Sequence, residues 1–205
     1  MSLQGSVYPV SIKGELTHPP SRALWLVKWL LAIPHYVIVV GLWIALLLVW
    51  VTVFFAILFT GKYPRILFDF NVGVLRWTWR VGFYSYEANG TDKYPPFTLE
   101  SVYDYPADLQ IEYPERLSKG LVLVKWWLLA IPHLLIVSFF QGGSKQQPFG
   151  LQIVIVIIAA VVLLFTGKHH EDIFKFVMGM NLWSYRVCAY MALMTDKYPP
   201  FRLWD

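Results

Sequence analysis

The feature that most constrains this chain is an apolar stretch, residues 23–60, that contains no Asp or Glu. It reads ALWLVKWLLAIPHYVIVVGLWIALLLVWVTVFFAILFT, and Lys28 is its only charged side chain. As a single helix it would be about 57 Å long, roughly twice the hydrocarbon thickness of a bilayer. Only 15% of the residues in the chain are charged, whereas soluble domains have about 25%. The stretch therefore predicts either two membrane helices folded back on each other or one over-long rod.

The apolar stretch recurs later in the chain together with the motifs around it. LVKW-LLAIPH, LFTGK and TDKYPPF each occur twice and in the same order, and the second copy of LVKW carries an inserted Trp. Ordered matches of this kind indicate a tandem duplication. We therefore expect two repeat units, residues 1–104 and residues 105–205.

Each unit is expected to place a helical hairpin in the membrane, at residues 22–61 and 118–167. A polar insertion, QGGSKQQPFG, divides the second apolar stretch into two pieces, and each piece is near the length of a span. We expect the first copy to turn tightly near Gly41. The alternative is an interfacial helix that ends at Ile33, is broken by Pro34 and is followed by one long span.

The positive charges suggest an orientation. If each unit crosses the membrane twice, both units enter it from the same side. An axis along the membrane normal then relates the two units. Every Lys and Arg except Lys145 falls at or near the open ends of the expected hairpins. The positive-inside rule then places both chain termini in the cytoplasm.

An amphipathic segment follows each hairpin, at residues 65–87 and 171–194. An aromatic face with a basic polar stripe is typical of a helix in the interface plane; a third crossing is the alternative, although its charges are costly. Alternating residues at 10–16 and 108–112, and short stretches after each TDKYPP, predict four short cytoplasmic strands, with extended linker as the alternative. The expected fold is a mainly α integral membrane protein of two tandem repeats.

The repeated LVKW-LLAIPH motif supplies the first candidate site residues, Lys28 and His35, which return as Lys125 and His133. A lysine stem can reach the headgroups or contact a lipid phosphate, and a histidine at membrane depth is costly unless paired. The inserted Trp separates Lys125 and His133 by eight residues instead of seven, so their side chains are expected to diverge by about 80°. A hydrogen bond to a carbonyl or hydroxyl group in the bundle is the ordinary role of each imidazole, and proton relay or ligand binding is the alternative.

The basic stripes of the amphipathic segments supply three more candidates for lipid headgroups or a pore, Arg76, Arg80 and Arg186. The run HHED at residues 169–172 looks like a metal cluster. Consecutive side chains splay apart on a helix, however, and acids at a helix N-terminus have an ordinary role there. We expect no metal, no cofactor and no catalytic residue.

These features favour a non-catalytic membrane protein, a lipid-interacting scaffold or an accessory subunit of a membrane complex. Each basic residue near an anionic surface contributes about 1 kcal/mol. The sequence has no phosphate-binding loop and no nucleophile elbow, so nothing in it supports an enzyme. The alternative is a channel or transporter for an anion or a lipid, with its path between the repeats or in a homo-oligomer. The expected partners are anionic membrane lipids and a further copy or membrane-complex subunit, and not nucleic acid.

The paired LVKW-LLAIPH, LFTGK-YPR-LFDFNVGVLRWTWRV and TDKYPPF blocks resemble a bacterial integral-membrane family, domain of unknown function 4389, in the tandem form of actinobacterial-type proteins. The resemblance covers nearly the whole chain. It implies a multi-pass protein of the bacterial inner (plasma) membrane built from two repeated units. It implies no activity, substrate or catalytic residue.

Overall fold

The computed structural model describes residues 8–16, 20–142, 149–167 and 170–204. Within them the chain forms two strands, seven α-helices and one π-helix, η1. In order they are β1 (Val10–Gly14), α1 (Trp25–Leu31), α2 (Ile33–Thr60), α3 (Arg65–Tyr84), β2 (Ala107–Ile111), α4 (Leu121–Val124), η1 (Lys125–Leu129), α5 (Ile131–Gln141), α6 (Leu151–Thr166) and α7 (Glu171–Met191). The expectation of a mainly helical chain with a small sheet is confirmed.

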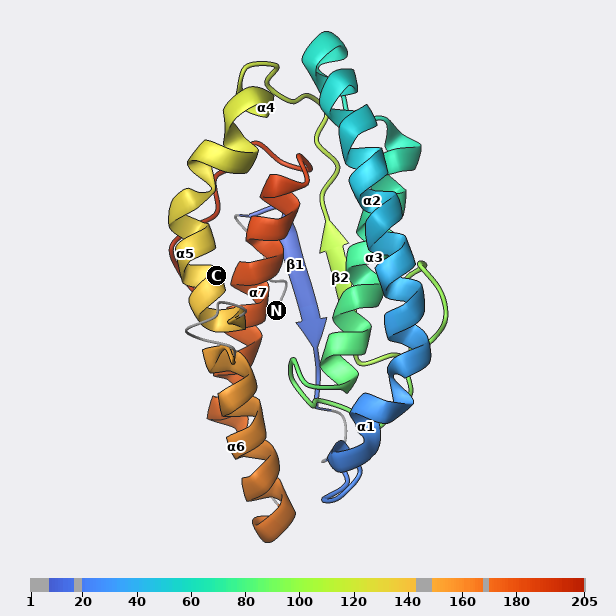
Figure 1. Ribbon diagram of the computed structural model, residues 1–205, viewed down its shortest axis with the longest axis vertical. Coiled ribbons are helices and arrows are strands. Elements are labelled where there is room, and N and C mark those ends of the chain that lie inside the picture. Colours follow the sequence, from blue (N-terminus) through green and yellow to red (C-terminus); the bar gives the residue numbers. More distant parts are fainter. Residues whose placement is uncertain (1–7, 17–19, 143–148, 168–169, 205) are drawn as a thin grey trace, which may run out of the picture.

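Two long apolar rods run along the molecule in opposite directions (Figure 1). Rod 1 consists of α1 and α2, and rod 2 consists of α4, η1, α5 and α6. Rod 1 ends at the top of Figure 1, where rod 2 begins, and rod 2 ends at the bottom near α1. The two copies of the apolar stretch are therefore antiparallel.

The predicted turn near Gly41 is wrong, because α2 is one unbroken helix of 28 residues. Glycine costs a helix interior only about 1 kcal/mol, and no turn-forming residue stands beside Gly41. The break falls at Ala32 instead, two residues before Pro34, which occupies the first turn of α2. Proline is tolerated there because the first N–H groups of a helix have no intrahelical partner. The helices thus follow the alternative, a short helix, a break and one long helix.

The second predicted hairpin is wrong as well. In Figure 1, α6 continues downward from α5 along the same edge of the molecule instead of folding back. A Cβ atom added to Gly142 would lie 2.3 Å from the backbone N of Gly150. The ends of the insertion therefore meet, and rod 2 resumes its direction after it. Lys145 lies outside the described residues.

The extra tryptophan of the second copy is absorbed by η1. A π-helical turn holds more residues than an α-helical turn, so one inserted residue can be accommodated without rotating the helix beyond it. Lys125 and His133 are both fully buried, as Lys28 and His35 are. The predicted divergence of Lys125 and His133 is therefore wrong, since the two pairs occupy equivalent places.

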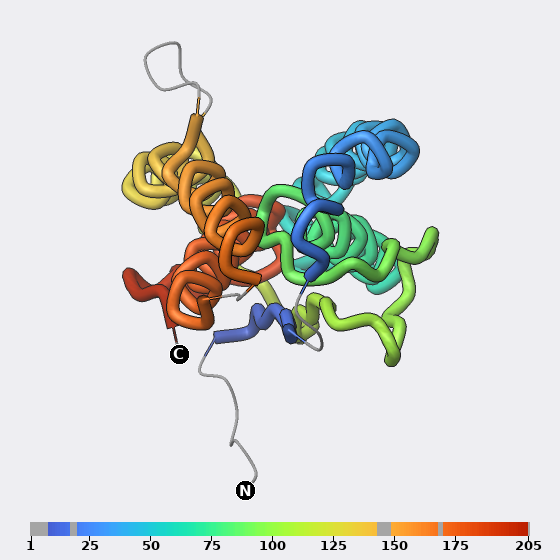
Figure 2. Tube along the Cα trace, turned by 90° about the horizontal axis from the view of Figure 1, so that it is seen from below, coloured from blue at the N-terminus to red at the C-terminus, as the bar shows by residue number. Residues whose placement is uncertain are grey.

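Viewed along the rods, the molecule has three layers (Figure 2). The rods form the first layer, α3 and α7 form the second, and β1 and β2 form the third. Most residues of α3 and α7 are buried, so the prediction of interfacial helices at 65–87 and 171–194 is wrong. Their basic stripes face the chain itself: Arg76 Nε donates to the carbonyl oxygen of Leu109 in β2 at 3.0 Å.

The expected strands at 10–16 and 108–112 are confirmed as β1 and β2. The described residues after each TDKYPP form no strand, so those two predictions are wrong. The strands pair antiparallel with Ile12 opposite Leu109, its counterpart 97 residues later, and the other pairs follow symmetrically on both sides. A pseudo-twofold axis therefore passes between Ile12 and Leu109 and relates the two repeats.

The repeats are interlocked at this axis. β2 of the second repeat packs on α3 of the first, while β1 of the first packs on α7 of the second. Tyr8 donates to the carbonyl oxygen of Lys197 at 3.1 Å, and its counterpart Tyr105 donates to that of Lys93 at 3.3 Å. Each tyrosine thus reaches the TDKYPPF segment of the other repeat, and one hydrophobic core spans both units.

The ends of the rods are also capped across the repeats. Lys119 Nζ donates to the carbonyl oxygen of Phe59 at 2.7 Å, at the C-terminus of rod 1. Arg22, its counterpart in the first repeat, packs on Gly167 at the end of rod 2. A basic side chain is favourable at a helix C-terminus because the last carbonyl groups carry partial negative charge.

Candidate functional site

Lys28 lies in a buried pocket of oxygen atoms formed by the TDKYPPF segment of its own repeat. Its ammonium group is 2.8 Å from Asp92 Oδ1, 2.8 Å from Asn89 Oδ1 and 2.7 Å from the carbonyl oxygen of Thr91. An ammonium group has three N–H donors, so these three acceptors satisfy it. The ring of Tyr84 lies 5.3 Å away.

The second repeat builds the same arrangement around Lys125. Its Nζ lies 2.7 Å from Asp196 Oδ1 and 3.0 Å from the carbonyl oxygen of Thr195. Leu193 replaces Asn89 at the position where both repeats adopt a positive φ angle. The sequence contained the signal for these pairs, because the lysine and the aspartate recur together in both repeats.

Each histidine is held by aromatic rings. Trp77 Nε1 donates to His35 Nδ1 at 3.0 Å, and Phe97 stacks on the imidazole at 4.0 Å between ring centroids. His133 has the same neighbours, with the Trp183 N–H at 3.1 Å and Phe201 stacked at 4.3 Å. An Nδ1 that accepts a hydrogen bond leaves the proton of a neutral imidazole on Nε2. Each imidazole thus has an internal hydrogen bond, but its partner is an indole N–H and not the expected carbonyl or hydroxyl group.

The three arginines also face the interior. Arg76 Nε lies 2.8 Å from Asp108 Oδ1, and Arg80 Nη1 donates to the carbonyl oxygen of Thr98 at 3.1 Å. Arg186 Nη1 donates to the carbonyl oxygen of Arg202 at 3.3 Å. All seven candidate cations and imidazoles thus have partners within the chain. Their role toward lipid headgroups or a pore stays a prediction.

A polar cluster that the sequence analysis missed joins the repeats near the break in rod 2. The carbonyl oxygen of Glu87 accepts from Gln152 Nε2 at 3.0 Å and from Asn181 Nδ2 at 3.1 Å. Gln152 and Asn181 replace Leu46 and Leu75 of the first repeat, so this cluster breaks the pseudo-symmetry. The repeat alignment contained this signal as two polar residues at apolar positions.

The carboxyl group of Glu87 is held within the same cluster. Its Oε2 atom is buried. Burial raises the pKa of Glu87 to about 7, and a hydrogen bond with Tyr185 opposes that shift in part. A carboxyl group with a raised pKa in the folded state stays protonated there while it ionises in the unfolded chain, so folding stability falls as pH rises between those two values.

Replacing Glu87 with Gln should therefore stabilise the protein at pH 8 and leave it unchanged near pH 4. The gain should be on the order of 2 kcal/mol, because ionising the buried glutamate at pH 8 costs more free energy than ionising it in the unfolded chain. Chemical unfolding in detergent at both pH values measures it. Glu100→Gln, at an exposed carboxylate, is the control. An equal effect of Glu87→Gln at pH 4 and pH 8 would contradict this assignment.

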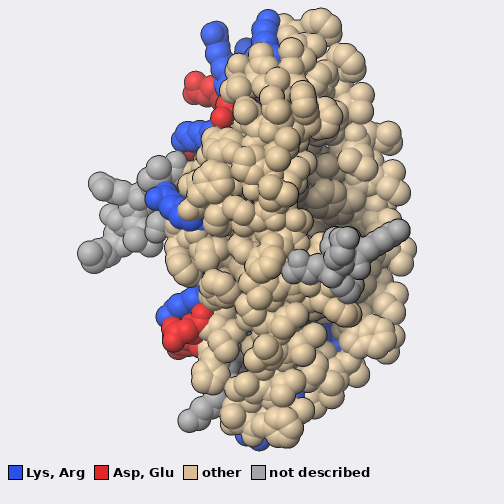
Figure 3. Space-filling model, turned by 60° about the vertical axis from the view of Figure 1, so that its left-hand side comes forward, with Lys and Arg blue, Asp and Glu red and all other residues tan. Residues whose placement is uncertain are grey.

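The rods expose a continuous set of large apolar side chains, which we call the apolar face. On α2 they recur every three or four residues, at Val37, Val40, Ile44, Leu47, Leu48, Val51, Phe55 and Phe59, and on rod 2 they include Leu135, Phe139, Ile158 and Phe165. Phe59 and Phe165 are 71% and 78% exposed. Figure 3 shows most charged side chains along the left edge and at the top, with a few basic ones near the bottom, and a broad surface between them without charge.

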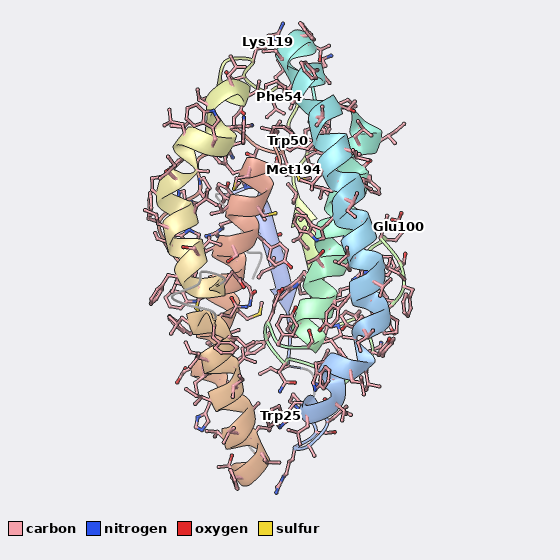
Figure 4. All side chains as sticks on the ribbon, in the orientation of Figure 1. Trp25, Trp50, Phe54, Glu100, Lys119 and Met194 are labelled. Atoms are coloured by element: carbon pink, nitrogen blue, oxygen red, sulfur yellow. The ribbon has the colours of Figure 1, made fainter. Side chains whose placement is uncertain are left out.

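A groove opens on the apolar face between the rods. Its volume is about 410 Å³, and Trp50 of α2, Trp126 of η1 and Val137 of α5 form its sides. Cys188 and Met191 of α7 form its floor. Figure 4 places Trp50 in the upper half of the molecule, on the side of α2 that faces rod 2. The groove has the size and lining of a site for an apolar ligand.

Among the described residues, α2 is the one helix that is long and apolar enough to cross a membrane. A second candidate arises if residues 121–141, which bend by 43° at a break, count as one span. These features are compatible with an association with a membrane. The described residues contain no group of three or more possible metal ligands, and His169 of the HHED run lies outside them.

Comparison with known proteins assigns the chain to a family. No curated protein and no solved structure matches it. The family model described as Domain of unknown function (DUF4389) matches residues 22–98 and again residues 122–202. Each match begins near the start of a rod and ends in or just after the TDKYPPF segment of the same repeat. The chain therefore belongs to the DUF4389 family and carries the family's domain twice.

Proposed function

We propose that this protein is a non-catalytic, lipid-interacting membrane protein whose apolar face lies in one leaflet of the bilayer. The rods would lie parallel to the membrane plane, and the pseudo-twofold axis would run along its normal. The protein would act as a scaffold or an accessory subunit that organises anionic lipid. The single observation that carries this proposal is the apolar face formed by both rods, opposite a sheet that exposes polar side chains.

The apolar face supports embedding because water is a poor solvent for it. Burying one large apolar side chain contributes about 1.5–3 kcal/mol when the side chain starts fully exposed. The side chains of α2 alone present eight partly exposed groups of this kind. Exposed patches formed by many large apolar side chains mark sites of contact with protein or membrane.

The position of the sheet favours the parallel orientation over a spanning one. The strands lie at the middle of the molecule's length (Figure 1), and Lys13 and Gln110 are exposed on them. If the rods crossed the bilayer, these side chains would lie at midplane depth. A lysine costs about 2.5–3.5 kcal/mol there. In the parallel orientation the same side chains face water, and the positive-inside rule assigns that face to the cytoplasm.

Binding to vesicles and the orientation of the helices test the proposal together. The purified protein should float with vesicles that contain anionic lipid and much less with neutral ones, because exposed basic residues add to the apolar contacts. In aligned bilayers, oriented circular dichroism should retain the helix band polarised along the helix axis, since α2, α3 and α7 all run with the long axis. Equal binding to both vesicles would contradict the lipid preference, and loss of that band would contradict the parallel orientation.

A channel or transporter for an anion or a lipid remains the alternative function. The furrow between the repeats is the observation that favours it. Flux of a permeant anion or of a labelled lipid in proteoliposomes, compared with flux in the His35→Ala and His133→Ala variants, would distinguish it from a scaffold. Self-association and the identity of any membrane-complex partner stay predictions.

A further inference from the structure

We propose that the groove between the rods binds one acyl chain of an anionic phospholipid, which lies along the furrow with its headgroup at Lys119. This inference rests on the proposed function, since it requires the apolar face to lie in a bilayer. It goes further by naming the ligand, the site and the direction in which the ligand lies.

Three polar side chains that line the groove already donate hydrogen bonds within the protein. Trp50 Nε1 donates to the carbonyl oxygen of Met191 at 3.0 Å, and Trp43 Nε1 donates to Thr78 Oγ1 at 3.1 Å. Ser184 Oγ donates to the carbonyl oxygen of Met180 at 3.0 Å. No charged side chain lines the groove within the described part of the chain. A ligand there gains by contact with apolar surface and not by hydrogen bonds, which suits a hydrocarbon chain.

The size of the groove favours a chain over a helix. One turn of a helix about 10 Å across and about 5.4 Å long occupies roughly 400 Å³. The whole groove measures about 410 Å³, so it could hold a single turn of a partner helix. A helix from a second copy of this protein would therefore leave most of its length outside, whereas one extended acyl chain matches a narrow furrow.

The charge at the outer end of the furrow selects the headgroup. Figure 4 places Phe54 and then Lys119 beyond Trp50 toward the top of the molecule. Lys119 is bonded to the carbonyl oxygen of Phe59, which lies nine residues beyond Trp50, a rise of about 14 Å along α2. That distance is close to the length of one acyl chain, about 15 Å if each leaflet forms half of the hydrocarbon thickness of a bilayer. Lys62, which follows the end of α2, is exposed beside it. An acyl chain in the groove would thus reach two basic side chains with its headgroup.

Photo-crosslinking in vesicles tests the proposal. The probe is phosphatidylglycerol with a diazirine at the end of one acyl chain, and phosphatidylcholine with the same chain is the neutral comparison. Labelled peptides should contain residues 46–50 and 184–191, and phosphatidylglycerol should label them several-fold more strongly than phosphatidylcholine. Labelling spread evenly over the exposed residues of both rods, or equal labelling by the two lipids, would overturn the proposal.

Matched variants locate the chain and the headgroup. Leu134→Trp narrows the mouth of the groove and should reduce its labelling at least fivefold, while Leu135→Trp, one residue away on the exposed side, should not. Lys119→Gln should reduce labelling by phosphatidylglycerol alone, and Arg22→Gln, the equivalent cap at the other end, should leave it unchanged. Thermal unfolding of each variant checks that it is folded. Crosslinks between two copies through residues 46–50 would show a protein occupant and overturn the proposal.

Vesicle flotation of the same samples separates the two proposals. A protein that floats with the vesicles but is labelled evenly retains the proposed function and loses this site. A protein that does not float loses both.

Discussion

Residues 1–104 expressed without the second repeat are expected to yield no folded monomer. β1 would lose α7, on which it packs, and α3 would lose β2. The hydroxyl group of Tyr8 would lose the carbonyl oxygen of Lys197. A helix that loses a large part of its tertiary packing cannot remain stable, because helical stability comes mainly from that packing. Circular dichroism during thermal unfolding, with size-exclusion chromatography in detergent, measures the outcome.

The control is the co-expression of two separate chains, residues 1–104 and residues 105–205. They should associate one to one and unfold in a single transition, because the covalent link at the boundary contributes only the entropy of joining two chains. A cooperative transition from the monomeric first fragment would contradict the interlocked arrangement. It would make each repeat an independent domain.

Asp92→Ala is expected to lower the free energy of unfolding by about 3 kcal/mol. Removing one partner of a buried ion pair leaves the other charge uncompensated, which commonly costs about 3–5 kcal/mol. The Lys28 side chain is only 2% exposed, so water solvates its charge poorly once the carboxylate is removed. The Asp92 side chain is 29% exposed, so the cost should lie at the lower end of that range. Unfolding by denaturant in detergent gives the difference from wild type.

Asp104→Ala is the matched control, since Asp104 pairs with Lys93 at the surface and its side chain is 72% exposed. Exposed pairs of this kind contribute about 0–1 kcal/mol.

The pH dependence of the Asp92→Ala effect adds a second readout. Burial opposes ionisation of Asp92, but its hydrogen bonds to Lys28 and Ser21 outweigh burial and lower its pKa. Its contribution is present above the ordinary carboxyl pKa and is lost as pH falls through the lowered value, below about pH 4. Asp92→Ala should lack that loss, and equal costs of the two substitutions would contradict the buried role of Asp92.

The duplication, the two strands and the helical class could be predicted from the sequence because they depend on local patterns. Three motifs repeat in order, and residues 10–16 alternate between apolar and polar as a half-buried strand does. The break before Pro34 could also be predicted, since proline lacks the N–H that a helix interior needs.

The arrangement in space could not be predicted from those patterns. An apolar stretch without acids gives no signal that separates a hairpin near Gly41 from one continuous helix. The stripe of Arg76 and Arg80 is the same whether it meets lipid headgroups or the carbonyl oxygens of Leu109 and Thr98. The spacing of residues indicates that a helix has a polar face, but it does not identify the groups that this face contacts.

The repeat makes the ion pairs of the buried lysines predictable from the sequence. Lys28 and Asp92 lie far apart in the sequence, and both recur in the second unit as Lys125 and Asp196. Two opposite charges that survive together in both halves of an otherwise apolar protein are candidates for one ion pair. The effect of the inserted tryptophan was harder to foresee, because η1 absorbs it locally.

The strand register also bears on ancestry. Ile12 pairs with its own counterpart, and each repeat lends its strand to the other's helix. Before duplication, a chain with one repeat could cover the same surfaces only by exchanging its strand with an identical chain. The arrangement is thus the one that a strand-swapped homodimer would have if its two subunits were joined into one polypeptide. Members of the family with a single copy are expected to exist as such dimers.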